Sequence, residues 1–246
     1  GHGWAQLADE GGLRRGFVLD SAASGSVVAS APMIALSYPI LGLLSLPLYL
    51  LPISLVLFSV RRYTGVQEAQ REALLALSQL PVVAAGVRPG HAAQVAELSV
   101  AVARRMGLRG EDLRSVERAA LLHDIGQVGL PVPLEHGATI EASAPAQDAM
   151  AAAARRVTRA ALDVPGLDHV LATVHTPYRR RHETGQDLPV EARIIKVVNA
   201  FDDLTEGAQG RLVVELAMQR LHLGLGYEYD PEVVEALEAV VAAQPG

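Results

Sequence analysis

The sequence predicts an all-α protein in which a helical bundle follows a transmembrane helical segment. Half of the 246 residues are apolar, and only 4% are aromatic. Ala, Leu and Val carry most of the hydrophobicity, a composition typical of helical proteins. In the second half of the chain apolar residues recur every three or four positions, whereas no alternation typical of strands is convincing. A long uncharged stretch near the N-terminus completes the prediction.

This uncharged stretch, within residues 21–62, is the predicted membrane segment. No charged residue occurs from Ser21 to Val60, and one straight helix of that length would be about 60 Å long, roughly twice the hydrocarbon thickness. Two short passes, or one pass plus an interfacial piece, fit better, and the expected interruption is at Pro39 near Gly42. A buried pair of core helices is the alternative, which the lack of a polar stripe disfavours.

Charges beside the segment predict its orientation. Arg61 and Arg62, followed by Tyr63, match a positive-inside stop with an aromatic anchor. We therefore expect an inner (cytoplasmic) membrane protein with the residues after Arg62 in the cytoplasm. Residues 1–20 are expected to form a poorly ordered or interfacial lead-in. The net charge of −6 argues against a nucleic-acid partner, and the lack of cysteine excludes a thiolate metal site.

Residues 63–88 are predicted to connect the membrane segment to the bundle. The connector begins as an amphipathic helix, which fits either a homodimer or packing on the following domain. Residues 81–90 contain two prolines and two glycines, and a linker is expected there. The apolar face of the connector consists of Val66, Ala69, Ala73, Leu77 and Leu80.

The bundle itself is predicted to occupy residues 89–246. Gly107 closes its first helix, and the turn at residues 229–231 precedes its last. Helices are expected at residues 91–106, 111–122, 145–162, 167–174, 190–204 and 232–243.

An adjacent His-Asp pair follows the helix at residues 111–122. His123 and Asp124 are both metal-ligand types, and they can reach one cation only if it lies beside the helix end, where other helices complete its shell. An ordinary capped helix end is the alternative. The pair therefore predicts imidazole and carboxylate partners elsewhere in the chain.

Three further stretches fit such a partner set. His91 lies 32 residues before His123, the histidine of the segment LLHDIGQVGLP (residues 121–131). Two segments follow later in the chain, ARIIKVVNAFDDLT (residues 192–205) and YEYDPEVVEAL (residues 227–237). Together, over roughly residues 90–237, they resemble the HD superfamily of metal-dependent phosphohydrolases, specifically its HD-GYP branch. The upstream LPLYLLPISLVLFSVRRY is similar to the last membrane span before such domains. The resemblance implies a helical bundle with divalent Fe, Mn or Zn that acts on a cyclic dinucleotide such as cyclic di-GMP.

The resemblance also implies the site residues. His91, His123 and Asp124 match metal ligands, and His123 and Asp124 are the catalytic pair. His175, favoured over a rival alignment at residue 182, matches one of two paired family histidines. Asn199 replaces the aspartate that closes the metal site, and its neutral amide coordinates weakly without supplying charge.

Other positions depart from the family pattern. Gln127 replaces a lysine that contacts phosphate, and Arg179 is a second candidate for substrate binding. Residues 151–154 contain only alanine where a histidine is expected, and the GYP triplet is absent. Asp202 and Asp203 are expected to turn away from the helix face that carries residue 199.

These matches and departures predict a membrane-anchored, degenerate HD-GYP-like protein that is non-catalytic or weakly active. It would serve as a signalling or interaction module, bind one divalent metal or none, and respond to a cyclic dinucleotide or a partner signalling protein. The alternative is an active metal-dependent phosphodiesterase that hydrolyses cyclic di-GMP or a related phosphate ester. The sequence leaves open whether the chain is an enzyme.

Overall fold

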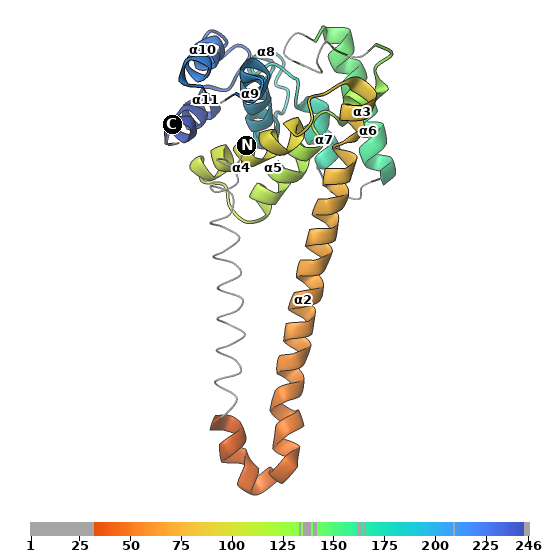
Figure 1. Cartoon of the computed structure of the whole chain (residues 1–246), viewed down its shortest axis with the longest axis vertical. Coiled ribbons are helices and arrows are strands. Elements are labelled where there is room, and N and C mark those ends of the chain that lie inside the picture. Colours follow the sequence, from red (N-terminus) through yellow and green to blue (C-terminus); the bar gives the residue numbers. More distant parts are fainter. Residues whose placement is uncertain are drawn as a thin grey trace. The chain divides into compact units, whose positions relative to one another are not determined.

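The structure is a computed structural model that describes residues 32–132, 134, 139, 142–161, 164, 166–208 and 210–243. The predicted lead-in and the start of the predicted membrane segment lie outside these residues. The described residues divide into two compact units, a first unit up to residue 72 and a second unit from residue 73 onwards. Apart from loops, turns and an isolated β-bridge, the described residues of both units are helical (Figure 1). The all-α class is confirmed.

The described part of the first unit is an apolar helical segment with one break. Residues 32–41 are helical, and the 3-10 turn η1 (Gly42–Leu44) separates them from α2 (Ser45–Leu77). Gly42 has φ +56°, which glycine adopts without a steric penalty. The interruption predicted near Pro39 and Gly42 is therefore confirmed, whereas α2 continues through Pro52.

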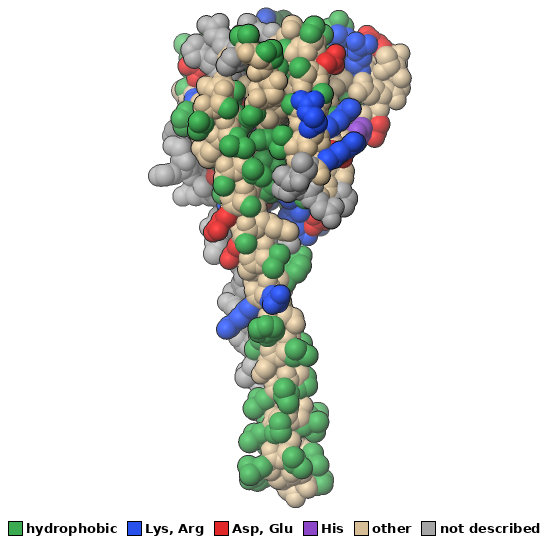
Figure 2. Space-filling view, turned by 90° about the vertical axis from the view of Figure 1, so that its right-hand side faces the viewer, with side chains coloured by type: hydrophobic (Ala, Val, Ile, Leu, Met, Phe, Trp, Pro, Cys, Tyr) green, Lys and Arg blue, Asp and Glu red, His purple; other side chains and the backbone are tan. Residues whose placement is uncertain are grey.

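This segment carries its apolar side chains on the surface. Leu36, Ile40, Leu43 and Phe58 expose 62–86% of their area, and Figure 2 shows apolar side chains along the helix. The most apolar 18-residue window has a mean hydropathy of 2.3. Length and composition thus make this segment a candidate membrane span.

The predicted connector is mostly the end of α2. That helix runs unbroken to Leu77, and α3 (Leu80–Ala85) follows. Residues 81–85 were wrongly predicted as a linker, because Pro81 lies in the first turn of α3, where its missing N–H costs no helical hydrogen bond. Gly86, with φ +73°, ends this helix.

Three helices form the centre of the second unit: α4 (His91–Arg105), α5 (Glu111–Leu121) and α9 (Val190–Thr205). They pack against one another, because each has a continuous apolar face that is removed from water. The fully buried side chains on these faces include Val95, Val102, Val116, Ile194, Ile195 and Val198.

Further helices cover this centre on two sides (Figure 1). On one side α10 (Arg211–His222) and α11 (Pro231–Ala242) pack on α9, and on the other α7 (Leu167–Thr173) packs on α5 and α6 (Ala144–Ala161). The six predicted bundle helices match α4, α5, α6, α7, α9 and α11 to within one residue at each end. The prediction missed α10 and the short α8 (Arg180–Glu183).

Candidate metal centre

The His-Asp pair lies in a tight turn between two helical elements. After α5 ends at Leu121, the 3-10 turn η2 (Ile125–Gly129) begins directly behind Asp124. A Cβ atom on Gly126 would lie 2.3 Å from the carbonyl oxygen of Met150 in α6. Only glycine permits so close an approach, so the packing of α6 on η2 fixes the turn that presents the pair.

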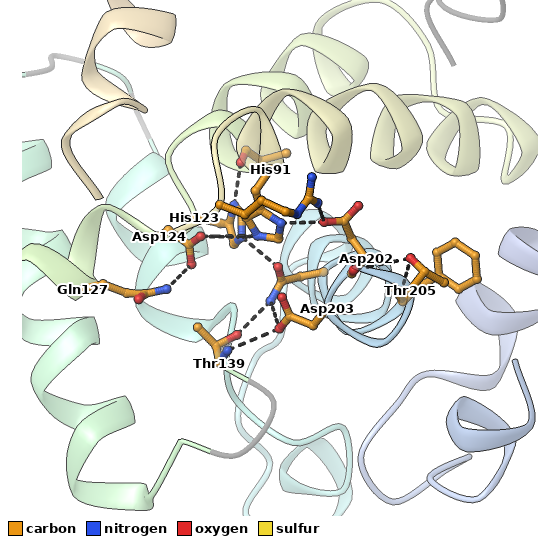
Figure 3. Close-up of polar contacts among 12 residues, drawn as sticks. His91, His123, Asp124, Gln127, Thr139, Asp202, Asp203 and Thr205 are labelled. Carbon is orange, nitrogen blue, oxygen red and sulfur yellow. Dashed lines mark hydrogen bonds and ion pairs between the residues drawn. The ribbon is translucent and has the colours of Figure 1, made fainter. Parts of the chain in front are cut away.

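Three buried side chains converge beside this turn (Figure 3). Nε2 of His91, in the first turn of α4, lies 3.2 Å from Nε2 of His123. Oδ2 of Asp124 lies 3.4 Å from the first nitrogen and 3.3 Å from the second. None of the three residues exposes more than 4% of its surface. Within the described residues Oδ2 of Asp124 has no hydrogen-bond partner, which is uncommon for a buried carboxylate oxygen.

The spacing of these three atoms fits one metal ion. Imidazole nitrogens and carboxylate oxygens bind an ion such as Zn²⁺ at about 2.0–2.2 Å, so adjacent donors in a tetrahedral shell lie roughly 3.3–3.5 Å apart. The distances among His91, His123 and Asp124 are 3.2, 3.3 and 3.4 Å. The donors therefore fit an ion with little rearrangement, and the unpaired Oδ2 is one of them.

In both histidines Nδ1 forms a hydrogen bond, which leaves Nε2 available as a metal ligand. Nδ1 of His123 donates to the carbonyl oxygen of Ala120 at 2.7 Å, and Nδ1 of His91 donates to Oδ2 of Asp202 at 2.6 Å. In the neutral imidazole Nδ1 therefore carries the proton, and the lone pair of Nε2 faces the centre. Arg88 contacts the same oxygen of Asp202 at 2.5 Å.

Asn199 on α9 contributes a fourth candidate donor, an amide oxygen. Its Oδ1 lies 2.9 Å from Nε2 of His123. Its Nδ2 donates to Oγ1 of Thr139 at 2.7 Å and lies 3.5 Å from Oδ2 of Asp203. The candidate shell thus contains two imidazole nitrogens, one carboxylate oxygen and one amide oxygen.

The electrostatics favour positive charge in this centre. Burial alone would lower the pKa of His91, but the adjacent carboxylates of Asp124 and Asp202 outweigh it and raise the pKa to about 10. Burial would raise the pKa of Asp124, yet His123 and His91 hold that pKa well below its usual range. A proton on His91 and a metal ion consequently compete for the space beside Asp124.

His175 lies close to the centre but outside the group of converging donors. The donor atoms within 4.8 Å of one another belong to His91, His123 and Asp124. His175 instead lines a pocket beside Asn199. Burial, followed by the charge of Lys196, lowers the pKa of His175 to about 3, which keeps this imidazole neutral.

The two predicted substrate contacts occupy different surroundings. Gln127 is only 1% exposed, and its Nε2 donates to Oδ1 of Asp124 at 2.7 Å. Arg179 lies over the ring of Tyr227, 4.0 Å from its centroid, and forms an ion pair with Glu228 at 3.5 Å. Gln127 thus orients a donor of the candidate shell, and contact with a substrate stays a prediction for both residues.

The expectation that Asp202 and Asp203 turn away from residue 199 was wrong. Residues three and four positions apart on a helix share a face, so Asp202 reaches His91 and Asp203 approaches Asn199. Helical spacing in the sequence could have identified both. Thr139 lies between η2 and α6 and carries no recognisable sequence signal.

Comparisons with known proteins agree with this geometry. The HD domain family model matches residues 72–233, which include all four candidate donors. A similar protein is the cyclic di-GMP phosphodiesterase response regulator RpfG of Xanthomonas campestris pv. campestris (strain 8004), 27% identical over 188 residues. The match covers 70% of this chain and 48% of that relative, so the chain spans about half the relative's length. No solved structure gives a significant match. The chain belongs to the HD domain family.

Proposed function

We propose that this chain is a membrane-anchored HD-domain signalling protein of the HD-GYP type that binds one divalent metal ion and has little or no phosphodiesterase activity. The observation that carries the proposal is the donor set. His91, His123 and Asp124 converge with metal-ligand spacing, whereas the fourth donor, Asn199, is a neutral amide. Fe, Mn and Zn all suit these nitrogen and oxygen ligands.

The residues around the centre support one ion rather than two. A two-metal site holds its ions about 3.5–4 Å apart and needs a second set of ligands. Residues 151–154, where the family pattern places a histidine, are alanines of α6. Ala153 is buried against η2. A Cβ atom added to Gly129 would lie 2.5 Å from the Cβ atom of Ala153. These alanines thus offer no ligand for a second ion, and Ala153 is enclosed by helix packing.

The surroundings of the phosphate position also support weak catalysis. Phosphoryl transfer depends on cations that stabilise negative charge in the transition state. Gln127 supplies no charge where the family pattern has lysine, and its amide contacts Asp124. With one ion and no lysine at position 127, the site retains binding groups but has fewer groups for catalysis.

The N-terminal helix supports a role in signalling at a membrane. We propose that the apolar segment anchors the chain in the inner (cytoplasmic) membrane, with residues after Arg62 in the cytoplasm. Leu74, near the end of α2, is buried in the core of the second unit, and α3 packs on η2 directly behind the His-Asp pair. A displacement of α2 would thus reach the metal centre through one short helix. Its amphipathic end is also the proposed surface for a homodimer.

An active phosphodiesterase is the second candidate. It is favoured by the polar pocket beside Asn199, which is lined by Lys196, His175 and Thr139. A lysine beside a metal centre can contact a phosphate. The substrate would be cyclic di-GMP or a related phosphate ester.

Metal analysis and an assay of the full chain in detergent distinguish the two candidates. We expect about one ion per chain by elemental analysis, and no cyclic di-GMP hydrolysis above that of His123→Ala. Turnover that needs metal and disappears in His123→Ala would establish the phosphodiesterase. If the chain loads no Fe, Mn or Zn, both metal-dependent proposals fail, and calorimetry with cyclic di-GMP then tests whether the domain only binds the nucleotide.

A further inference from the structure

We propose that Asp203 is the second carboxylate of the metal centre, acting through Asn199 as a positioning residue rather than as a direct ligand. The inference rests on the proposed metal binding and adds a residue that supplies negative charge and orients the amide. Asp203 lies one helical turn after Asn199, so both side chains lie on the same face of α9.

The first argument is the orientation of the amide. Oδ2 of Asp203 accepts a hydrogen bond from the backbone N–H of Thr139 at 3.2 Å and lies 3.5 Å from Nδ2 of Asn199. Nδ2 also donates to Oγ1 of Thr139 at 2.7 Å. Two acceptors thus hold the NH₂ group of Asn199, and its Oδ1 lies beside Nε2 of His123. A flipped amide would lose both contacts.

The second argument is the balance of charge. The neighbouring Asp202 already has Arg88 and His91 as partners, whereas Asp203 forms no ion pair with lysine or arginine in the described part of the chain. A partly buried carboxylate without a cation is unfavourable. A divalent ion would supply the missing positive charge.

Both arguments explain how the centre can hold a cation with a neutral residue at position 199. Asp124 would neutralise one charge of the ion by direct contact, and Asp203 would neutralise the other from one hydrogen bond away. Residues that orient metal ligands typically change metal affinity by about 10–100-fold when they are removed. The effect of Asp203 should therefore be measurable without any assay of activity.

The test is Mn²⁺ binding to the full chain in detergent, followed by the electron paramagnetic resonance signal of free Mn²⁺. Asp203→Asn keeps the shape and removes the charge, and we expect a loss of affinity of about 10–100-fold. The double variant Asn199→Asp with Asp203→Asn moves the carboxylate by one turn, and it should recover wild-type affinity or exceed it. Asp187→Asn removes an equal charge from an exposed carboxylate and should leave the affinity unchanged.

The outcomes separate this inference from the proposed function. If the wild-type chain binds neither Mn²⁺ nor Fe²⁺ nor Zn²⁺, the proposed metal centre and the role of Asp203 both fail; if it binds only Fe²⁺ or Zn²⁺, the same variants are compared by their content of that ion. If the wild type binds and Asp203→Asn binds equally well, the role of Asp203 alone is overturned. A loss in Asp203→Asn that the double variant does not recover would also overturn it, because the loss would then not come from the charge. Circular dichroism of each variant confirms that it is folded.

Discussion

The two halves of the metal centre are built differently. The half from α4 and the turn after α5 contributes His91, His123 and Asp124, whose ligand atoms are already 3.2–3.4 Å apart. The half from α9 contributes the amide of Asn199, which depends on Thr139 and Asp203 for its orientation. The first half has the geometry for binding an ion, whereas the second offers a neutral oxygen. The proposal of metal binding with little catalysis rests on this difference.

The difference follows from where each half is anchored. His91 and His123 are held by hydrogen bonds from Nδ1 to groups on α9 and α5, and Gly126 fixes the turn against α6. The Asn199 amide instead relies partly on Thr139, which lies in the connection between η2 and α6. Core helices tolerate little displacement of their side chains, so the two halves differ in what orients their donors: groups on core helices for His91 and His123, and Thr139 with Asp203 for Asn199.

The largest expected effect on metal affinity comes from removing a ligand of the first half. His123→Ala removes the nitrogen that lies near all the other donors, and metal affinity should fall by more than about 100-fold, because the loss of a ligand exceeds the 10–100-fold typical of residues behind it. Elemental analysis after dialysis measures the bound ion. His169→Ala, at a half-exposed histidine, is the matched control and should retain the metal. Equal metal content in both variants would contradict the assignment.

The proton on His91 gives the next largest effect. Its pKa is raised to about 10 by Asp124 and Asp202 against the opposing effect of burial, so below that pH an entering ion must displace one proton. Metal affinity should therefore rise with pH, by about tenfold per unit and about 100-fold between pH 6 and 8. Calorimetry in buffers of different ionisation enthalpy should report release of about one proton. Affinity independent of pH would mean that His91 is already neutral.

The second half can be strengthened by one substitution. Asn199→Asp places a charged oxygen where Oδ1 lies 2.9 Å from His123, and Oγ1 of Thr139 can still donate to it. Metal affinity should increase by at least about tenfold, since a carboxylate is the stronger ligand for a divalent ion. Asn199→Gln, which keeps the amide, serves as the control and should show no gain. An unchanged affinity in Asn199→Asp would show that residue 199 does not contact the ion.

The sequence predicted the two halves unequally. Apolar residues with a helical period identified α4, α5 and α9 and thereby the positions of His91, His123, Asp124 and Asn199. The same periodicity, applied at spacings of three and four, would have placed Asp202 and Asp203 on the face of residue 199. A periodic pattern carries no information about a contact from a loop, so Thr139 could not be predicted.

The missed helices have a related cause. Leu212 and Leu216 of α10 are 68% and 56% exposed, so the apolar pattern of this helix does not coincide with one buried face. In α3 the prolines and glycines that mark a linker lie instead at the first turn and just beyond the end of a short helix. Whether a proline or glycine indicates a linker or a helix end depends on its position relative to the helix, which composition alone does not give.

The smallest expected effect concerns Arg88, which contacts the oxygen of Asp202 that accepts from His91. Arg88→Gln removes a positive charge near the centre while Asp202 keeps its bond to His91, so metal affinity should rise by about two- to threefold. The gain is small because the side chain of Arg88 is 33% exposed and solvent screens its charge. The Mn²⁺ titration at low and high salt measures the effect, which should shrink at high salt. A fall in affinity would instead mean that Arg88 holds Asp202 in position, so that the groups that orient His91 would include a partly exposed side chain.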